Sequence, residues 1–439
     1  MKTSQGLQMN KNRLKSIDLF AGCGGLSLGL HYAGWDGLFA IERDPMAFST
    51  FENNFLESSA PYRSFEAWPV WLPKKNHDIK ELLASDAFRE HLASLRGSID
   101  LMAGGPPCQG FSVGGRRDGT DERNDLVFHM LDAVELVQPK IVLIENVEGI
   151  ARPFVARPGE AKASAAERVL RELKRLGYTG TFQVVRAEAF GVPQYRRRVV
   201  IVGFRDASAT PGQVKKLFAE ALDDAAQLVR EAWSLGEGDI CALDALNDLH
   251  GGARVTCPDS EKYESVYYTK ARSPYAIAMR RGFSNKAIPN SHRFSVHGKK
   301  IQELYSLAHE TQQPGRLSKE FLLSNGTKKD KKVLIDAALP VSTITTHPDE
   351  FIHYAEPRNI TVREMARLQS FPDDFTFHGR YTINGPRRRH DVARCSQVGN
   401  AVPPLMAQGI GYALQRMMNV LGKQAEVCME EGNQFAIPA

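Results

Sequence analysis

The chain has 439 residues, of which 42% are hydrophobic and 24% charged, and a formal net charge of +5 at pH 7. These values are typical of a soluble globular protein with two or three domains. No apolar run approaches the roughly 20 residues of a membrane-spanning helix, and the first residues lack the apolar core of a secretory signal peptide. We therefore expect a cytoplasmic protein that has no membrane partner.

The six cysteines are scattered along the chain, and no two of them form a Cys-x-x-Cys pair. This spacing argues against a zinc site and provides no disulfide framework. We expect reduced thiols and no bound metal ion.

The N-terminal part of the sequence predicts a strand, a glycine-rich turn and a helix. Residues 16–20 are a short apolar strand, residues 22–25 contain three glycines, and a helix follows over residues 26–33. This unit is typical of nucleotide-binding α/β folds, but Ser27 replaces the third glycine of the dinucleotide fingerprint, which leaves room for an adenosyl cofactor. Glu42 lies twenty residues after the first of these glycines, where an acid can accept hydrogen bonds from ribose hydroxyls.

A helical stretch begins after Asp78 and extends to about residue 95, following a loop insertion over residues 57–76 that is rich in Pro, Trp and Ser. Asp78 is either a ligand at the end of a strand or the cap of this helix. The pattern alone favours the cap, because Asp readily accepts hydrogen bonds from the first turn of a helix.

The segment Ala103–Ser112, AGGPPCQGFS, follows a short apolar run and carries Cys108. Two glycines and two prolines end the preceding strand and predict a rigid loop. The thiol therefore lies at the carboxyl end of a strand, where open α/β sheets bind their ligands. A lone cysteine is more often buried and structural. Taken alone, this loop favours the structural interpretation.

Two further polar groups follow predicted strands. Glu145 ends the apolar run of residues 140–144 and emerges at the same sheet edge as Cys108. Burial there would raise the pKa of the carboxyl group and keep a proton available near neutral pH, although an exposed helix cap is an equal alternative. Farther on, Arg196 and Arg198 share one face of a strand, with Arg197 opposite. Such a pair suits a polar ring or a phosphate, but a solvated surface is also consistent with it.

From residue 207 the alternation of strands and helices stops, and positive charge accumulates. Residues 254–332 contain 16 Lys and Arg residues against 7 Asp and Glu residues, a net charge of +9, whereas the rest of the chain carries −4. Aromatic residues are interleaved with these cations. A basic block is the electrostatic footprint of a polyanion such as nucleic acid, and a solvated lysine-rich face is the alternative. After this region, residues 361–368 predict a short amphipathic helix.

Taken in order, these pieces resemble the cytosine carbon-5 DNA methyltransferases of the bacterial or phage type. The resemblance rests on seven blocks in the family's order and leaves out only residues 207–332 and the two ends. The blocks are DLFAGCGGLSLGL, Glu42, GGPPCQGFS, ENVEG, QYRRR, RNITVREMARLQSFPDDF and QVGNAVPP. Seven blocks in this order are specific, and they change the interpretation of Cys108 from a structural residue to a nucleophile.

The resemblance implies an α/β fold with a doubly wound, mostly parallel, Rossmann-like sheet and a second, smaller target-recognition domain. Residues 1–205 and 396–425 would form the catalytic domain that binds S-adenosylmethionine. Residues 206–357 would form the recognition domain, supported by a hinge over residues 358–395. The basic charge of residues 254–332 agrees with this division.

The resemblance also implies a reaction. A methyl group would pass from S-adenosylmethionine to carbon 5 of a flipped cytosine in a specific duplex DNA sequence, through a covalent adduct of Cys108. Glu145 would hydrogen-bond the base, and Arg196 and Arg198 would favour the thiolate. The residues implied to contact the cofactor are Phe20, Gly22, Gly24, Glu42, Asp78, Pro107 and Asn400.

Two alternatives remain. An RNA cytosine carbon-5 methyltransferase would use the same fold and thiol, but the long basic region favours double-stranded DNA. An inactive DNA-binding subunit is disfavoured by the intact PPCQ, ENV and QYRRR blocks. We expect a monomer in a restriction–modification system, whose partner would be a restriction endonuclease acting on the same site.

Overall fold

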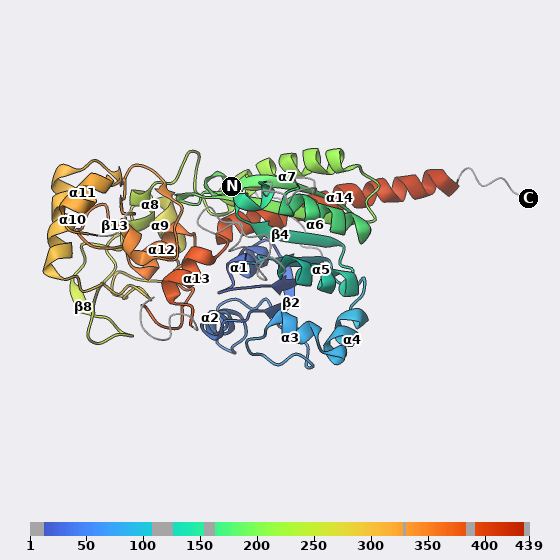
Figure 1. The fold of residues 1–439 in the computed structure, drawn as a ribbon, viewed down its shortest axis with the longest axis horizontal. Helices are drawn as coiled ribbons and strands as arrows, with labels where there is room; N and C mark the ends of the chain where they lie inside the picture. The colour runs from blue at the N-terminus through green and yellow to red at the C-terminus, as the bar shows by residue number, and fades with distance from the viewer. Residues whose placement is uncertain (1–12, 108–125, 153–162, 328–330, 383–390, 434–439) are drawn as a thin grey trace, which may run out of the picture.

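The computed structural model describes residues 13–107, 126–152, 163–327, 331–382 and 391–433, with side chains described up to residue 421. Figure 1 shows a large α/β part, a smaller part built mainly from residues 240–400, and a long C-terminal helix that lies along the large part. Among these described residues, no helix is both long enough and apolar enough to cross a membrane.

The large part is organised around a six-stranded sheet with the order β2-β1-β3-β4-β7-β5. The strands are β1 (Leu14–Leu19), β2 (Trp35–Ile41), β3 (Leu101–Gly104), β4 (Ile141–Asn146), β5 (Tyr178–Arg186) and β7 (Arg197–Arg205). β1 pairs in parallel with β2 and β3, β3 pairs in parallel with β4, and β7 is antiparallel to both of its neighbours. The mostly parallel sheet that was predicted is therefore confirmed.

Helices cover both faces of this sheet, which is why β4 is buried along its whole length. One face packs against α1 (Gly25–Tyr32), α2 (Pro45–Phe55), α7 (Pro211–Ala232) and α14 (Pro404–Asn433). The other face packs against α3 (Ile79–Leu83), α4 (Asp86–Ser94), α5 (Leu126–Val137) and α6 (Ala165–Arg175). Short 3-10 helices follow β4 at Glu148–Ala151 and β5 at Ala187–Phe190. The doubly wound arrangement is confirmed.

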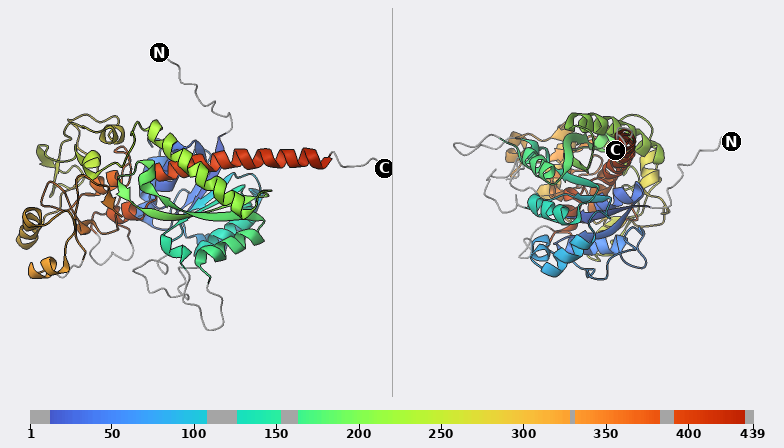
Figure 2. Two further views of the ribbon diagram at one scale, coloured as in Figure 1. Left: turned by 90° about the horizontal axis from the view of Figure 1, so that it is seen from above. Right: turned by 90° about the vertical axis from the view of Figure 1, so that its right-hand side faces the viewer.

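Helix α14 brings the C-terminal part of the chain back onto the N-terminal glycine loop, and Figure 2 shows it lying beside α7. The contact between α14 and α1 is close because Gly29 has no side chain. A β-carbon at Gly29 would lie 2.3 Å from the Ala407 β-carbon. The Ala407 β-carbon is bonded directly to the backbone, so the two helices themselves would have to move apart to make room. The helix interface thus depends on a glycine in the predicted glycine-rich block.

The insertion over residues 57–76 covers the exposed edge of β2. The Gly37 N–H donates a 2.8 Å hydrogen bond to the Ser64 carbonyl, and the Phe65 ring fills the space above Gly37. Trp71 packs edge-on against Phe39 with ring centroids 5.5 Å apart. A covered edge strand cannot pair with another chain, so the insertion protects the sheet.

The smaller part contains short elements joined by long loops. Its helices are α8 (Ala242–Leu246), α9 (Pro274–Met279), α10 (Lys299–Thr311), α11 (Lys319–Ser324), α12 (Val362–Leu368) and α13 (Arg394–Asn400), with a 3-10 turn at Pro348–Glu350. Its strands are β8 (Arg254–Thr256), β9 (Glu264–Val266), β10 (Gly315–Arg316), β11 (Val333–Leu334), β12 (Val341–Ser342) and β13 (Phe351–Ile352). β12 pairs in parallel with β6 (Gln194–Tyr195) and joins the two parts.

Helix α12 is buried on all sides, so the prediction of an amphipathic helix was wrong. Arg367 in this helix forms ion pairs with Asp248 at 3.0 Å and Asp373 at 2.6 Å, and all three side chains are fully buried. Arg358 similarly pairs with Glu364 at 2.7 Å. Buried charges are tolerated when they are paired and hydrogen-bonded, so these partners replace the solvent that the sequence pattern led us to expect.

Candidate active site

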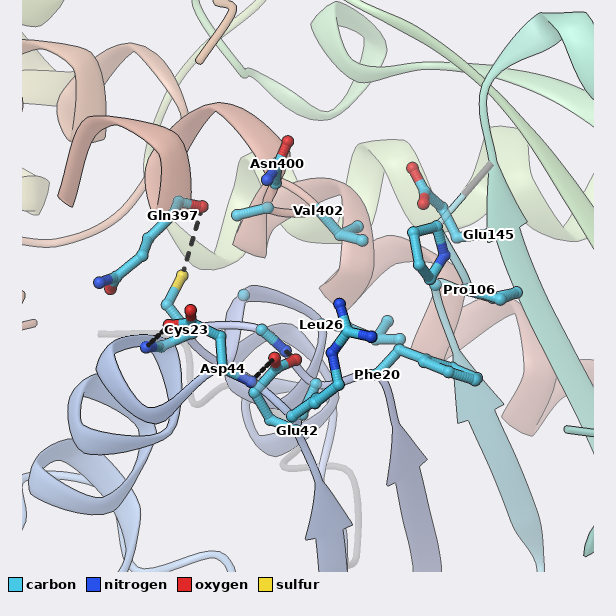
Figure 3. Close-up of a pocket in the computed structure, with 18 of the residues that line it drawn as sticks. Phe20, Cys23, Leu26, Glu42, Asp44, Pro106, Glu145, Gln397, Asn400 and Val402 are labelled. Carbon is cyan, nitrogen blue, oxygen red and sulfur yellow. Dashed lines mark hydrogen bonds between the residues drawn. The ribbon is translucent and has the colours of Figure 1, made fainter. Parts of the chain in front are cut away.

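A pocket of about 410 Å³ lies at the carboxyl ends of β1, β2, β3 and β4 (Figure 3). One wall consists of the loops that follow these strands, and the other consists of residues 392–402, which precede α14. Open α/β sheets bind ligands at this edge, because the strand-end loops diverge there. The predicted cofactor residues that line the pocket are Phe20, Gly22, Glu42, Asp78, Pro107 and Asn400.

The glycine loop makes room on its pocket side. Phe20 and Gly22 both have positive φ, 60° and 57°, and nothing lies within 4 Å of where a Gly22 β-carbon would be. Gly24, which was also predicted to contact the cofactor, instead faces α2. A β-carbon at Gly24 would lie 2.5 Å from the Phe55 ring. The structure therefore places Gly24 beneath the loop, outside the residues that line the pocket.

Glu42 lies at the end of β2 and is held by the backbone on both of its oxygens. Oε2 accepts a 2.9 Å hydrogen bond from the Gly22 N–H, and Oε1 accepts a 2.7 Å bond from the Asp44 N–H. Burial raises the pKa of this carboxyl group, while the two N–H donors act to lower it. A carboxylate has about four acceptor positions, so each oxygen can accept one more hydrogen bond from a ligand.

Of the two roles that the sequence left open for Asp78, the structure shows the helix cap. Its Oδ1 accepts a 2.8 Å hydrogen bond from the Lys80 N–H, which confirms that it caps α3. Its Oδ2 lies 3.7 Å from Arg43 Nη1, and both side chains line the pocket. The cap orients the carboxylate so that Oδ2 is available at the pocket wall.

Glu145 and Arg198 form an ion pair on the opposite side of the pocket. Arg198 Nε lies 3.0 Å from Glu145 Oε1, and the two side chains are only 13% and 11% exposed. β4 and β7 are antiparallel with Glu145 opposite Val200, so Arg198 is a diagonal neighbour on the same face. Glu145 is therefore buried, and the interpretation of it as an exposed helix cap is wrong.

Arg196 also lines the pocket, and Arg197 is exposed, as the predicted alternation requires. However, the guanidinium group of Arg196 donates to the backbone carbonyls of Ile344, Gly399 and Ala401 at 3.3, 3.1 and 3.1 Å. Burial, followed by repulsion from Arg198, lowers the pKa of Arg196. Arg196 thus binds the wall that precedes α14.

Replacing Arg196 by Met should lower the free energy of unfolding by at least about 3 kcal/mol, because three carbonyl groups lose a charged donor in a buried site. Urea denaturation measures this change. Arg197→Met is the matched control. The Arg197 side chain is 61% exposed, and its ion pair with Glu148, at 4.0 Å, is a weak surface pair. Similar small losses of unfolding free energy in both variants would contradict the conclusion that Arg196 holds the pocket wall in place.

Asp18 supports the glycine loop from below. It is the last residue but one of β1, is 2% exposed, and accepts a 2.5 Å hydrogen bond from the Ser27 hydroxyl in α1. Burial raises the pKa of Asp18 to about 7, an effect that the bond from Ser27 partly opposes. Ser27, which departs from the dinucleotide fingerprint, therefore contributes a hydrogen bond between the strand and the helix.

The pKa of Asp18 predicts a pH dependence of stability. Because the folded state binds this proton more tightly than the unfolded state, the free energy of unfolding should fall between about pH 4 and pH 7, by up to roughly 4 kcal/mol, and then level off. Urea denaturation at pH 5 and pH 8 measures this decline. Asp18→Asn should flatten it, and an unchanged decline in that variant would contradict the assignment.

Sequence reasoning missed three polar residues that hold the pocket together. Asn146 Nδ2 donates to the Pro106 carbonyl at 3.1 Å and so connects β4 to the PPC loop. Gln397 accepts from Thr50 Oγ1 at 2.7 Å, and Asp44 caps α2. Asn146 and Gln397 stand inside quoted blocks, and the Asp44-Pro45 pair is a helix-start signal. The cap made by Asp44 is local, but Pro106 and Thr50 are distant in sequence from Asn146 and Gln397, so no local pattern reveals those two contacts.

Cys108 lies outside the described residues. Pro107, directly before it, lines the pocket, and a β-carbon at Gly105 would lie 3.4 Å from Glu145 Oε2. The residues directly before Cys108 thus adjoin Glu145.

Comparison with known proteins decides the family. The sequence profile of the family described as C-5 cytosine-specific DNA methylase matches residues 14–416. The chain belongs to this family. It is 29% identical over 407 residues to the Type II methyltransferase M1.HphI of Haemophilus parahaemolyticus, covering 92% of this chain and 87% of that protein. It is 28% identical over 406 residues to the Type II methyltransferase M.DdeI of Desulfomicrobium norvegicum, covering 90% and 86%.

The fold of this family member has a counterpart among solved structures. An Escherichia coli protein encoded within a prophage and described as a putative DNA modification methyltransferase superposes with a TM-score of 0.60. It is 24% identical and covers 92% of this chain and 99% of its own. The predicted family and DNA cytosine methyltransferase activity are confirmed, and the RNA alternative is not favoured. Family and fold together imply S-adenosylmethionine as the methyl donor.

Proposed function

We propose that this methylase modifies carbon 5 of a cytosine flipped out of a specific duplex DNA sequence, as the modification enzyme of a restriction–modification system. The observation that carries the proposal is the placement of the Glu145–Arg198 pair in the same pocket as Glu42. One side of the pocket suits a polar ring, and the other suits a ribose. The names of the relatives, Type II methyltransferases, support the biological setting.

The residues of the cofactor side fit S-adenosylmethionine, which supplies an electrophilic methyl group when bound. Glu42 has acceptor positions free for ribose hydroxyls, and Asp78 Oδ2 can accept from an adenine amino group. Gly22 leaves open space beside the loop. Phe20, Pro107 and Asn400 complete the lining, and Gly24 supports the loop from beneath.

On the base side, the thiolate of Cys108 adds to carbon 6 of cytosine and makes carbon 5 electron-rich. Glu145 hydrogen-bonds ring nitrogen 3 and the exocyclic amine. Arg198 is held by Glu145 through Nε and by the Arg197 carbonyl through Nη1, and it turns its Nη2 group to the base. Carbon 5 would then take the methyl group from the sulfonium, which leaves S-adenosylhomocysteine. Loss of the carbon 5 proton to a base would break the bond between carbon 6 and the Cys108 sulfur, which departs as the thiolate. We assign Arg196 to positioning, because its Nη1 and Nη2 groups already donate to backbone carbonyls.

The recognition domain would supply the DNA contacts that offset the cost of flipping, roughly a few kcal/mol. We place its start after α7, since this helix packs against α14 and β5 on the sheet. Its +9 charge over residues 254–332 should make binding strongly dependent on salt. We further propose a cytoplasmic monomer whose functional partner is an endonuclease that cleaves the same sequence.

The test is to express the protein in a bacterial host that lacks cytosine methylation and to sequence its DNA after bisulfite treatment. We expect one short sequence to be methylated at a single cytosine. The purified protein should also transfer labelled methyl groups to duplex DNA and not to transfer RNA. Methylation of RNA alone, or of no nucleic acid, would overturn the proposal.

A further inference from the structure

Val392 is the point at which the chain arriving from the recognition domain joins the cofactor pocket. Both polar groups of its backbone are bound by side chains of the pocket. Its N–H donates to Asp44 Oδ2 at 3.0 Å, and its carbonyl accepts from Gln397 Nε2 at 3.1 Å. In Figure 3, Asp44 and Gln397 stand on different walls of the pocket. Val392 is therefore fixed by both walls.

Asp44 connects this point directly to the proposed ribose site. Its backbone N–H donates to Glu42 Oε1 at 2.7 Å, and its Oδ1 accepts from Met46 and Ala47 at 2.9 and 2.8 Å. One residue thus orients the ribose acid, caps α2, and holds Val392, which is 348 residues away in sequence. Asp44 is thus a single residue that hydrogen-bonds both Val392 and Glu42.

Close to Val392 in sequence, Arg394 contacts the recognition domain. Arg394, two residues farther on, pairs with Asp259 at 2.5 Å and donates to Ser291 Oγ at 3.1 Å. Asp259 lies between β8 and β9 in the basic segment, and Tyr381 also donates to it, at 2.8 Å. The β8–β9 hairpin is thereby connected to the strip of chain formed by residues 392–394, which Asp44 holds at Val392.

We infer that Asp44 is a positioning residue that couples cofactor binding at Glu42 to DNA binding by the recognition domain. The inference rests on the proposed function. A ligand at Glu42 fixes Asp44 and hence Val392, and DNA that fixes the β8–β9 hairpin acts on the same strip through Arg394. Coupling of this kind is reciprocal, so each ligand must raise the affinity for the other by the same factor.

The test uses a thermodynamic cycle on the full-length protein. Calorimetry gives the Kd of S-adenosylhomocysteine with and without a duplex that carries the sequence identified by bisulfite sequencing. Fluorescence anisotropy gives the Kd of that duplex with and without S-adenosylhomocysteine. In the wild-type protein we expect a coupling factor of at least about fivefold, equal in both directions. A wild-type factor of one would overturn the inference.

Asp44→Ser is the decisive variant, because serine still caps α2 but is too short to reach Val392. We expect its coupling factor to fall below about twofold, with a smaller change in cofactor affinity of the free protein. Asp259→Asn should reduce the factor likewise from the other end. Ser85→Ala, which removes the cap of α4 far from the pocket, should leave the factor unchanged.

An Asp44→Ser variant with the wild-type factor would overturn the inference. So would cofactor affinity that falls by the same ratio with and without DNA, because Asp44 would then be an ordinary pocket residue. A wild-type protein that binds neither ligand would instead overturn the proposed function. Thermal unfolding of each variant checks that it is folded.

Discussion

A Cys108→Ala variant should transfer no detectable methyl group, a loss of at least about a thousandfold, while S-adenosylhomocysteine binding stays within about threefold of wild type. The expected loss follows because carbon 5 of cytosine is a poor nucleophile until a thiolate adds to carbon 6. Cofactor binding persists because its proposed determinants, Gly22 and Glu42, lie on separate loops. Labelled methyl transfer to duplex DNA and calorimetry measure the two quantities.

Cys241→Ser is the matched control for a cysteine that should not matter. This thiol lies ahead of α8, where it donates to Asp244 at 3.0 Å, away from the residues that line the pocket. A duplex with fluorine at carbon 5 of the target cytosine adds a second readout, since fluorine replaces the proton whose loss would release the enzyme. It should trap the wild-type protein and the Cys241 variant, but not Cys108→Ala. Full activity of Cys108→Ala would refute the covalent mechanism.

Glu145→Gln should lower kcat by roughly 100- to 1000-fold while the Kd for DNA changes by less than about threefold. Glutamine keeps the shape of the side chain and can still accept from Arg198, but it cannot carry the proton that the activated base requires. Single-turnover methyl transfer and DNA binding separate the two effects.

Glu148→Gln provides the comparison for Glu145→Gln, because Glu148 is three residues farther on and pairs with the exposed Arg197 at 4.0 Å. That variant should retain nearly full activity. If Glu145→Gln weakened DNA binding as much as it slowed the reaction, Glu145 would be a binding residue with no specific part in the chemistry.

Short-range patterns predicted the parts of the fold that depend on local sequence. The run before Glu145 is apolar at every position because β4 is covered by helices on both faces, and such runs identify buried strands. The twenty-residue spacing from Gly22 to Glu42 reflects one strand–helix–strand unit, β1–α1–β2. The Gly22 N–H and Glu42 Oε2 are 2.9 Å apart.

Long-range partners could not be predicted in this way. The charges of α12 suggested a solvent-exposed face. Arg367 is instead buried, and the acids that pair with it include Asp248, 119 residues away. The aromatic residues of the basic segment did not predict which side chains reach its surface, since Tyr268, Tyr275 and Phe294 are buried. Arg196 and Arg198 were predicted to share a strand face, but Arg196 lies between β6 and β7 and binds backbone carbonyls, whereas Arg198 lies in β7 and binds Glu145.

The return of α14 onto α1 has a consequence for how the protein is made. Residues 20–47 form one wall of the pocket and residues 392–402 form the other, so they leave the ribosome almost the whole chain length apart. During synthesis the first wall exists without its counterpart, and contacts of such long sequence separation form late in folding. Until residues 392–402 have been made, the nascent chain therefore carries no complete cofactor pocket, and the protein becomes able to modify DNA only after α14 has docked.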